Sequence, residues 1–279
     1  MESLKKVAAI NDLSGASRCS LTVALPIISS LGIQCCVLPT AILSNHTGYD
    51  KFFFEDYTSQ MKEFLKNWKN LSMKFDCIYS GFLGSHSQIE TVIEFINDFK
   101  NENTKIIIDP VMGDNGKIYS TYSDKLCSDM KKLVSVSDIV TPNITEACVL
   151  SDTKYSGETV SMEKLTQMAE KISALGAKNV VITGHRSKEK VANFVYSDGF
   201  VKSFETDVVP KYFSGTGDVF ASVITGLTAL GYDVFKSVEF AANFVHRAAL
   251  LSLEMGLDVN EGICFEKLLG ELTALKGDI

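Results

Sequence analysis

The chain has 279 residues, of which 46% are apolar and 22% are charged, a composition typical of a globular protein with a well-filled core. Its formal net charge is −7 without long runs of one sign, so we expect no binding of nucleic acid or of an anionic membrane. The longest apolar stretches, such as residues 241–253, are interrupted by polar residues and are shorter than the roughly 20 residues of a membrane span. Residues 1–6 lack the apolar segment of a signal peptide, and we expect a cytoplasmic protein.

The cysteines form no C-x-x-C pair. Several lie in apolar runs, as in residues 33–38, which favours small buried side chains in a reducing compartment. The seven are Cys19, Cys35, Cys36, Cys77, Cys127, Cys148 and Cys264.

Short apolar runs alternate with amphipathic stretches along the chain. The runs predict strands at residues 6–10, 34–38, 77–80, 105–109, 138–141 and 179–183. Residues 88–99 carry apolar side chains at spacings of three and four, which predicts a helix with one apolar face. Because parallel strands need a helix to return the chain, the alternation predicts an α/β fold with a mostly parallel, doubly wound sheet and helices on both faces.

Two later runs, residues 191–197 and 200–206, flank Asp198-Gly199, a pair suited to a tight turn, so we expect an antiparallel hairpin at one sheet edge. The sequence has no linker, low-complexity tract or repeat, and we expect residues 1–279 to form a single domain. Ligands of such sheets bind beyond the carboxyl ends of the strands, so motifs directly after a strand are the candidate site.

The segment Ser214-Gly215-Thr216-Gly217-Asp218 opens a stretch that is predicted to be helical. Glycines at a helix start let backbone N–H groups surround an anion, which makes Gly215, Thr216 and Gly217 a candidate anion hole. Asp218 could simply be the N-cap of that helix. Beside an anion hole, the same carboxylate could instead accept a proton from an alcohol during phosphoryl transfer, and we take Asp218 as the candidate general base.

Neither G-x-x-x-x-G-K-[ST] nor G-x-G-x-x-G is present, which excludes the P-loop and the common dinucleotide motif. Instead, Gly215, Gly217 and Asp218 resemble the G-x-G-D motif of the ribokinase-like superfamily. The resemblance implies a three-layer ribokinase-like sandwich and ATP as co-substrate.

A second motif, Asp109-Pro110-Val111-Met112-Gly113-Asp114, follows a predicted strand. It could be only a turn that needs Pro and Gly, but Asp109 also offers the oxygen ligands that Mg²⁺ prefers, and residues 113–119 could close as a flexible lid. The motif is similar to a segment of pyridoxal kinases, a resemblance that implies that Asp109 and Tyr119 lie near the nucleotide phosphates.

A third motif, residues 141–147, places Glu146 three residues after Asn143, a spacing that also suits a helix capping box. Resemblance to the N-x-x-E pattern of ribokinase-like kinases implies that Asn143 and Glu146 order magnesium and phosphate, Glu146 through metal-bound water. Thr183, at the end of another strand, resembles a family position near the nucleotide.

The polar loop Ser44-Asn45-His46-Thr47-Gly48-Tyr49 favours a structural, hydrogen-bonded role for His46. The loop resembles the pyridoxal kinase segment that contacts the vitamin B6 ring, with Thr47 at the contacting position. Residues 80–85 resemble another segment of that family, in which Phe82 would lie against the ring where many pyridoxal kinases have tyrosine.

The segment Asn11-Asp12-Leu13-Ser14-Gly15 differs from pyridoxal kinases and resembles the D-x-S-G start of hydroxymethylpyrimidine kinases. Asp12 could pair with a protonated ring nitrogen or accept from a ring hydroxyl, with Ser14 beside it. Capping of a turn before the predicted helix at residues 17–31 is the alternative role for Asp12.

Together these resemblances imply an ATP- and Mg²⁺-dependent kinase that phosphorylates the 5′-hydroxymethyl group of pyridoxal, pyridoxamine or pyridoxine, and that forms a homodimer. A hydroxymethylpyrimidine kinase is the nearest alternative, although that family often has cysteine where this chain has Asp218. A sugar kinase and a non-catalytic B6-binding protein are more distant alternatives.

Overall fold

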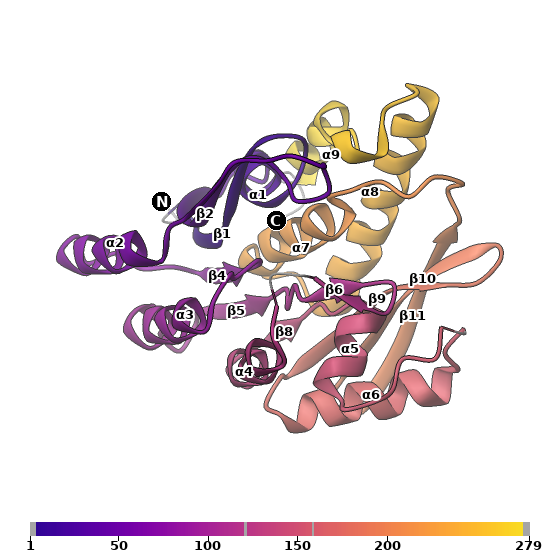
Figure 1. Cartoon of the computed structure of the whole chain (residues 1–279), viewed down its shortest axis with the longest axis horizontal. Coiled ribbons are helices and arrows are strands. Elements are labelled where there is room, and N and C mark those ends of the chain that lie inside the picture. Colours follow the sequence, from indigo (N-terminus) through magenta and orange to yellow (C-terminus); the bar gives the residue numbers. More distant parts are fainter. Residues whose placement is uncertain (1–3, 120–121, 158, 276–279) are drawn as a thin grey trace.

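The computed structural model describes residues 4–119, 122–157 and 159–275, so both ends of the expected domain, residues 1–3 and 276–279, lie outside the described residues. A nine-stranded sheet runs through the middle of the molecule in the order β11-β10-β9-β8-β5-β4-β1-β2-β3 (Figure 1). Its strands are β1 (Lys6–Ala16), β2 (Gln34–Asn45), β3 (Phe54–Asp56), β4 (Cys77–Ser80), β5 (Lys105–Ile108), β8 (Ile139–Val140), β9 (Asn179–Arg186), β10 (Lys190–Ser197) and β11 (Phe200–Asp207).

The central six strands pair in parallel, as the alternating sequence pattern predicts. The predicted hairpin is confirmed: β10 and β11 pair antiparallel at one edge, turning at Asp198-Gly199. The opposite edge carries β3, which pairs antiparallel with β2 and was not expected from the sequence. All three residues of β3 are exposed, so they have no alternation of buried and exposed side chains that could signal a strand.

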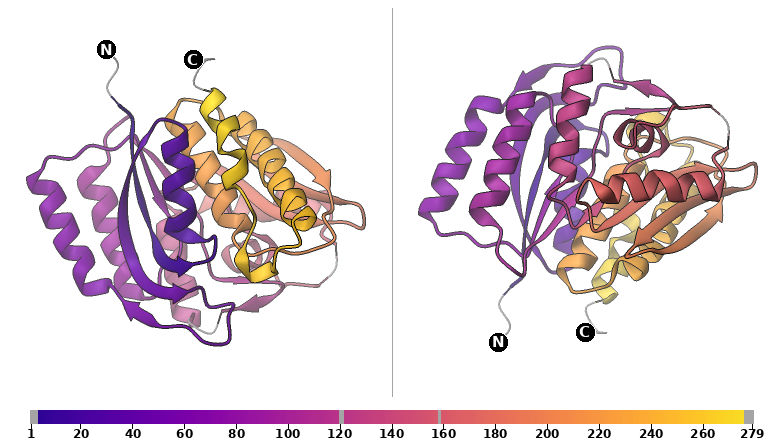
Figure 2. Two further views of the ribbon diagram at one scale, coloured as in Figure 1. Left: turned by 90° about the horizontal axis from the view of Figure 1, so that it is seen from above. Right: turned by 90° about the horizontal axis from the view of Figure 1, so that it is seen from below.

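Helices cover both faces of the sheet and complete the three-layer ribokinase-like sandwich (Figure 2). One face carries α1 (Ser20–Ser30), α7 (Thr216–Ala229), α8 (Val234–Glu254) and α9 (Leu269–Ala274). The other carries α2 (Thr58–Asn70), α3 (His86–Phe99), α4 (Asp124–Val134), α5 (Ile144–Leu150) and α6 (Met162–Ala174). Each face has its own buried apolar core, and within the described residues no helix is long and apolar enough to cross a membrane.

Side-chain caps fix where several helices begin. The helix predicted at residues 88–99 is α3, which begins two residues earlier because the Ser85 hydroxyl accepts a hydrogen bond from the Gln88 backbone N–H. Ser123 and Ser161 cap α4 and α6 in the same way.

The segment predicted to be a flexible lid forms a small hairpin of its own, β6 (Gly113–Asp114) and β7 (Lys117–Ile118). The Gly116 N–H donates to the Thr145 hydroxyl at 2.8 Å, and the Tyr119 N–H donates to the Met112 carbonyl at 2.9 Å. A two-stranded hairpin is marginal alone, so the contact with Thr145 of α5, together with the Asn143 amide that donates to the Gly113 carbonyl oxygen at 2.8 Å, holds it beside the start of α5.

Candidate active site

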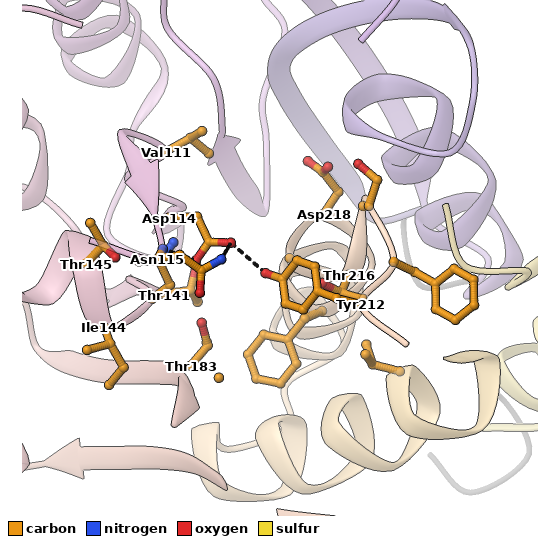
Figure 3. A pocket seen from close by; sticks show the side chains of 18 of the residues that line it. Val111, Asp114, Asn115, Thr141, Ile144, Thr145, Thr183, Tyr212, Thr216 and Asp218 are labelled. Carbon is orange, nitrogen blue, oxygen red and sulfur yellow. Dashed lines mark hydrogen bonds between the residues drawn. The ribbon is translucent and has the colours of Figure 1, made fainter. Parts of the chain in front are cut away.

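A large pocket of about 720 Å³ lies at the carboxyl ends of the parallel strands. All of the candidate site residues predicted from the sequence line it, although they lie up to about two hundred residues apart in the chain. The predicted residues in its wall are Asp12, Ser14, Thr47, Phe82, Asp109, Tyr119, Asn143, Glu146, Thr183, Gly215, Thr216, Gly217 and Asp218. Figure 3 shows that Asp218 and Thr216 face Thr141 and Thr183 across this space.

The candidate anion hole is the start of α7. Gly215 has φ of +73°, and a Cβ there would lie 1.9 Å from the Arg18 carbonyl oxygen, so only glycine fits. A Cβ on Gly217 would meet no atom within 4 Å, which leaves the helix start open. The free N–H groups and the positive end of the helix dipole therefore face the pocket.

Asp218 lies in the first turn of α7, but Gly215 is the N-cap, and no side chain caps this helix. The N-cap interpretation of Asp218 is therefore wrong. Burial raises the pKa of the Asp218 carboxyl to about 7, and the charges of Asp109 and Asp12 add to the rise. Hydrogen bonds from the Ser20 backbone and the Asn11 side chain act in the opposite direction. A pKa near neutrality is what a general base needs.

Asp109 and Glu146 form an acidic pair elsewhere in the pocket. Burial raises the pKa of Asp109 to about 7, while a hydrogen bond from the Thr141 hydroxyl at 3.1 Å lowers it. The pKa of Glu146 is raised well above its ordinary value, first by burial and then by the charge of Asp109. A bound cation would relieve both effects.

The capping box at the start of α5 is confirmed: Asn143 accepts from the Glu146 N–H at 3.0 Å, and Glu146 Oε2 accepts from the Asn143 N–H at 2.8 Å. Glu146 Oε1 accepts from the Met112 N–H at 3.0 Å. Both oxygens are thus oriented by backbone donors, each with acceptor capacity left.

The donor set around Asp109 and Glu146 fits Mg²⁺ rather than a metal held entirely by protein. Among the described residues, no group of three or more His, Cys, Asp or Glu side chains could hold a metal ion. Mg²⁺ takes one or two carboxylates together with water and substrate phosphates, which is what this pair would supply.

The other end of the pocket is built from β1, β2 and the loop after β4. Asp12 is buried, which raises the pKa of its carboxyl, and it accepts from the Ser14 hydroxyl at 2.8 Å and the Ser20 hydroxyl at 2.5 Å. The N-cap of α1 is Cys19, so Asp12 does not cap that helix. The Phe82 ring lies edge-on to Tyr122, with ring centroids 6.1 Å apart.

The structural interpretation of His46 is confirmed. Its Nε2 donates to the Asn260 carbonyl oxygen at 2.8 Å, and its Nδ1 accepts from the Gly48 N–H at 3.0 Å. His46 thereby ties the loop that holds Thr47 to the C-terminal part of the chain.

Two residues of the site were not found from the sequence. Tyr212, four residues before the candidate anion hole's Thr216, donates from its hydroxyl to Asp114 Oδ2 at 2.8 Å, a contact that crosses the pocket (Figure 3). Asn11 donates from its amide to Asp218 Oδ1 at 3.5 Å. Tyr212 belongs to no motif, and Asn11 directly precedes the D-x-S-G residues at the end of a predicted strand, but no role was predicted for it.

Comparison with known proteins agrees with this geometry. A family model described as phosphomethylpyrimidine kinase matches residues 25–263. A Bacteroides thetaiotaomicron protein described as a "putative phosphomethylpyrimidine kinase", solved with pyridoxal, is 38% identical, with a TM-score of 0.92 and coverage of 97% of this chain and 96% of that one.

Two pyridoxal kinases of known structure are also similar. That of Lactobacillus plantarum is 26% identical, with a TM-score of 0.91 and coverage of 99% of both chains. That of Staphylococcus aureus, solved with AMP-PCP, is 25% identical, with a TM-score of 0.78 and coverage of 89% of both chains. The resemblances drawn from the motifs are therefore confirmed at the level of the family. The chain belongs to the phosphomethylpyrimidine kinase family, a group of kinases with the ribokinase-like fold.

Proposed function

We propose that the protein transfers the γ-phosphoryl group of ATP to the 5′-hydroxymethyl group of a vitamin B6 vitamer, namely pyridoxal, pyridoxamine or pyridoxine. The observation that carries this proposal is the presence in one pocket of the half-buried Asp218 carboxylate, the open start of α7, and the two loops that carry Thr47 and Phe82. Pyridoxal in the Bacteroides relative and AMP-PCP in the Staphylococcus relative support the two substrates.

In the proposed reaction, Asp218 accepts the proton of the alcohol as the alcohol oxygen attacks the γ-phosphorus and the bond to the bridging β–γ oxygen breaks. The backbone N–H groups of Gly215, Thr216 and Gly217 stabilise the negative charge on the transferring group. Their direction is fixed by α7 before substrate binds, so no reorganisation is needed during transfer.

At the nucleotide end, Asn143, Thr183 and Tyr119 are proposed to contact ATP. Asp109 and Glu146 are the residues that would hold Mg²⁺, which neutralises phosphate charge when bound. At the ring end, Thr47 and Phe82 are proposed to bind the pyridine, with Asp12 and Ser14 below it. The Asp12 carboxylate keeps acceptor capacity beyond its two serine hydrogen bonds and could accept one from a ring N–H.

A direct test compares ATP turnover by the purified protein with Mg²⁺ on pyridoxal, pyridoxamine, pyridoxine and hydroxymethylpyrimidine. The proposal expects the highest kcat/KM for a B6 vitamer. A higher kcat/KM for hydroxymethylpyrimidine would overturn it.

Hydroxymethylpyrimidine kinase is the second candidate, favoured by the description of the family model and by the Asp12–Ser14 pair. In this chain both candidates would use Asp218 and the same anion hole, so the kinetic comparison separates them by the choice of ring. A non-catalytic B6-binding protein is the third, and it predicts pyridoxal binding without ATP consumption. The Asp218 carboxylate argues against the third candidate because binding alone needs no base.

The proposal takes residues 1–279 as one kinase domain that acts as a homodimer in the cytoplasm. The nine-stranded sheet supports the single domain, and seven free cysteines, six of them buried, support a reducing compartment. Light scattering on the purified protein tests the dimer, for which a mass of twice 30.6 kDa is expected.

A further inference from the structure

Asn11 lies behind the pocket wall, in contact with Asp12, Phe82 and Asp218, which line the pocket. It lies on β1, where the pairing with β2 becomes irregular between Asn11 and Leu13, and its side chain is completely buried. A buried amide must find partners for its oxygen and its nitrogen, so its surroundings fix what it can do.

Two backbone donors determine which way the Asn11 amide points. Its Oδ1 accepts from the Phe82 N–H at 2.8 Å and from the Asp12 N–H at 3.0 Å. A reversed amide would place an NH₂ group against these two N–H donors. The nitrogen must therefore point the other way, where Asp218 Oδ1 lies 3.5 Å from it.

The neighbouring backbone is shaped around this amide. A Cβ on Gly81 would lie 2.3 Å from Asn11 Nδ2 and 2.6 Å from Asn11 Cγ. Gly81 does not have a left-handed φ, so glycine is needed here for space rather than for backbone conformation. The close approach of the loop after β4 to β1 thus depends on the pair Asn11 and Gly81.

We propose that Asn11 is a positioning residue that holds the carboxylate of Asp218 and the backbone of Phe82 in one fixed arrangement, so that the proton acceptor and the ring-binding loop keep their relative places. The proposal rests on the proposed function, in which Asp218 is the base. Asn11 acts through these two residues and does not itself touch the reacting atoms.

Removing the amide has two consequences. The ionised form of Asp218 loses a donor, which raises the pKa of the carboxyl, and the Phe82 N–H loses its acceptor, which frees the ring-binding loop. A purely structural role would lower stability without moving the ionisation of Asp218.

The primary test is a ¹³C-carboxyl NMR titration of the ligand-free protein labelled at aspartate, with the Asp218 signal identified by its loss in Asp218→Asn. In Asn11→Ala we expect the pKa of Asp218 to rise by about 0.5 to 1 unit. A rise below about 0.2 unit in a folded variant would overturn the proposal. Because no substrate is present, a wrong choice of acceptor alcohol would leave this result in place.

Kinetics of Asn11→Asp provide the second test and cover the case in which Asn11→Ala does not fold. The aspartate keeps an oxygen for the two backbone donors but places a carboxylate against Asp218. We expect kcat at pH 7 to fall about 10- to 100-fold and to recover in part near pH 9, with KM for ATP changed less than about 2-fold. An equal loss at all pH values would count against the proposal.

Asn179→Asp is the matched control. The Asn179 amide also bridges strand ends, donating to the Asp138 carbonyl oxygen at 2.8 Å and accepting from the Ser197 hydroxyl at 2.6 Å, but it is the first residue of β9 and lies at the amino end of the parallel strands, outside the pocket lining. The Asn179→Asp substitution should leave the pH dependence of kcat unchanged. Gly81→Ala should raise the pKa of Asp218 as Asn11→Ala does. The double variant should lower kcat by less than the product of the two separate fold-changes.

Discussion

At the scale of single residues, Asp218 is subject to opposing effects on its ionisation. Burial and two nearby carboxylates raise its pKa, whereas two hydrogen-bond donors lower it. With the pKa at about 7, a large share of the molecules have an ionised acceptor at neutral pH, and the conjugate acid can release the proton after transfer.

Asp218→Asn removes the acceptor but keeps the shape of the side chain. We expect kcat to fall by about 10²- to 10⁴-fold, because a positioned base contributes that much, while the ATP dissociation constant changes less than about 3-fold. Single-turnover kinetics and equilibrium titration with ATP check the two parts separately. Near-normal turnover would remove Asp218 from the role of base.

The pH dependence of the unmodified protein follows from the same group. With Asp218 as the proposed base, the ionised carboxylate is the active form, so kcat should increase with pH and reach half its plateau at about 7. A profile from pH 5.5 to 9 at saturating substrates measures this. A half-maximal kcat near pH 4 would show that burial does not set the pKa of Asp218 in the enzyme–substrate complex.

Phe82 presents an aromatic ring without a hydroxyl at the ring end of the pocket. Phe82→Leu keeps an apolar side chain but removes the aromatic face, so KM for the B6 vitamer should rise about 3- to 10-fold, the size of an aromatic pair contribution. KM for ATP should stay constant, and steady-state kinetics with each substrate varied in turn provides the comparison. Equal changes in both KM values would contradict a local role.

At the scale of elements, the β6–β7 hairpin spans the pocket through the hydrogen bond between Tyr212 and Asp114 (Figure 3). The Tyr212 ring also lies under the Arg186 guanidinium, 5.7 Å from its centroid. Burial and the charge of Asp114 raise the pKa of Tyr212, so its hydroxyl remains a donor at physiological pH. The hairpin is thus tied to the segment that leads into the start of α7.

Tyr212→Phe removes this contact and leaves the ring. We expect faster amide hydrogen exchange over residues 113–119 and a KM for ATP about 2- to 5-fold higher, since such a hydrogen bond contributes about 0.5 to 1 kcal/mol. Exchange measured by mass spectrometry tests the first effect. Tyr196→Phe, on β10, is the control and should leave these residues unchanged.

The elements that the sequence predicted are those whose own side chains carry a pattern. Cys77–Ser80 was predicted with its observed bounds because all four residues are buried between helices on both faces. The strand β3 and the β6–β7 hairpin exist through pairing with their neighbours, so their sequences carry no such signal.

The same distinction holds within the site. Most motif residues could be placed because they lie near or just after the carboxyl end of a parallel strand, and those ends meet on one side of the sheet. Asn11 and Tyr212 act through side chains from other elements, and the sequence offers no spacing that would connect them with Asp218 or Asp114.

At the scale of the whole molecule, four carboxyl groups lie around one pocket, three of them on buried residues and one on the half-buried Asp218, and loss of solvation raises the pKa of each. A carboxyl whose pKa is higher in the folded than in the unfolded protein binds protons more tightly when folded. Its contribution to stability is therefore fully present below about pH 4 and is lost as the pH rises through the folded pKa, which is about 7 for Asp109 and Asp218. The four carboxyl groups are those of Asp12, Asp109, Glu146 and Asp218.

Asp109→Asn should raise Tm at pH 8 by about 4 to 8 °C, because removing a buried charge that costs about 2 kcal/mol has an effect of this size in a chain of this length. At pH 5, where Asp109 is already protonated, the gain should be much smaller. Thermal unfolding in the presence of EDTA at both pH values measures the difference. The exposed Asp50→Asn serves as the control, and an equal gain at both pH values would contradict the explanation.

The packing of α1 against α7 has a consequence for how the protein is made. On the ribosome, the side of α1 that packs against α7 is synthesised about two hundred residues before α7 itself. At about 5 to 20 residues per second, this apolar surface stays uncovered for roughly 10 to 40 s. A nascent chain that has not yet reached residue 216 should therefore be a client of chaperones, and one that stops there should aggregate rather than accumulate as a partial kinase.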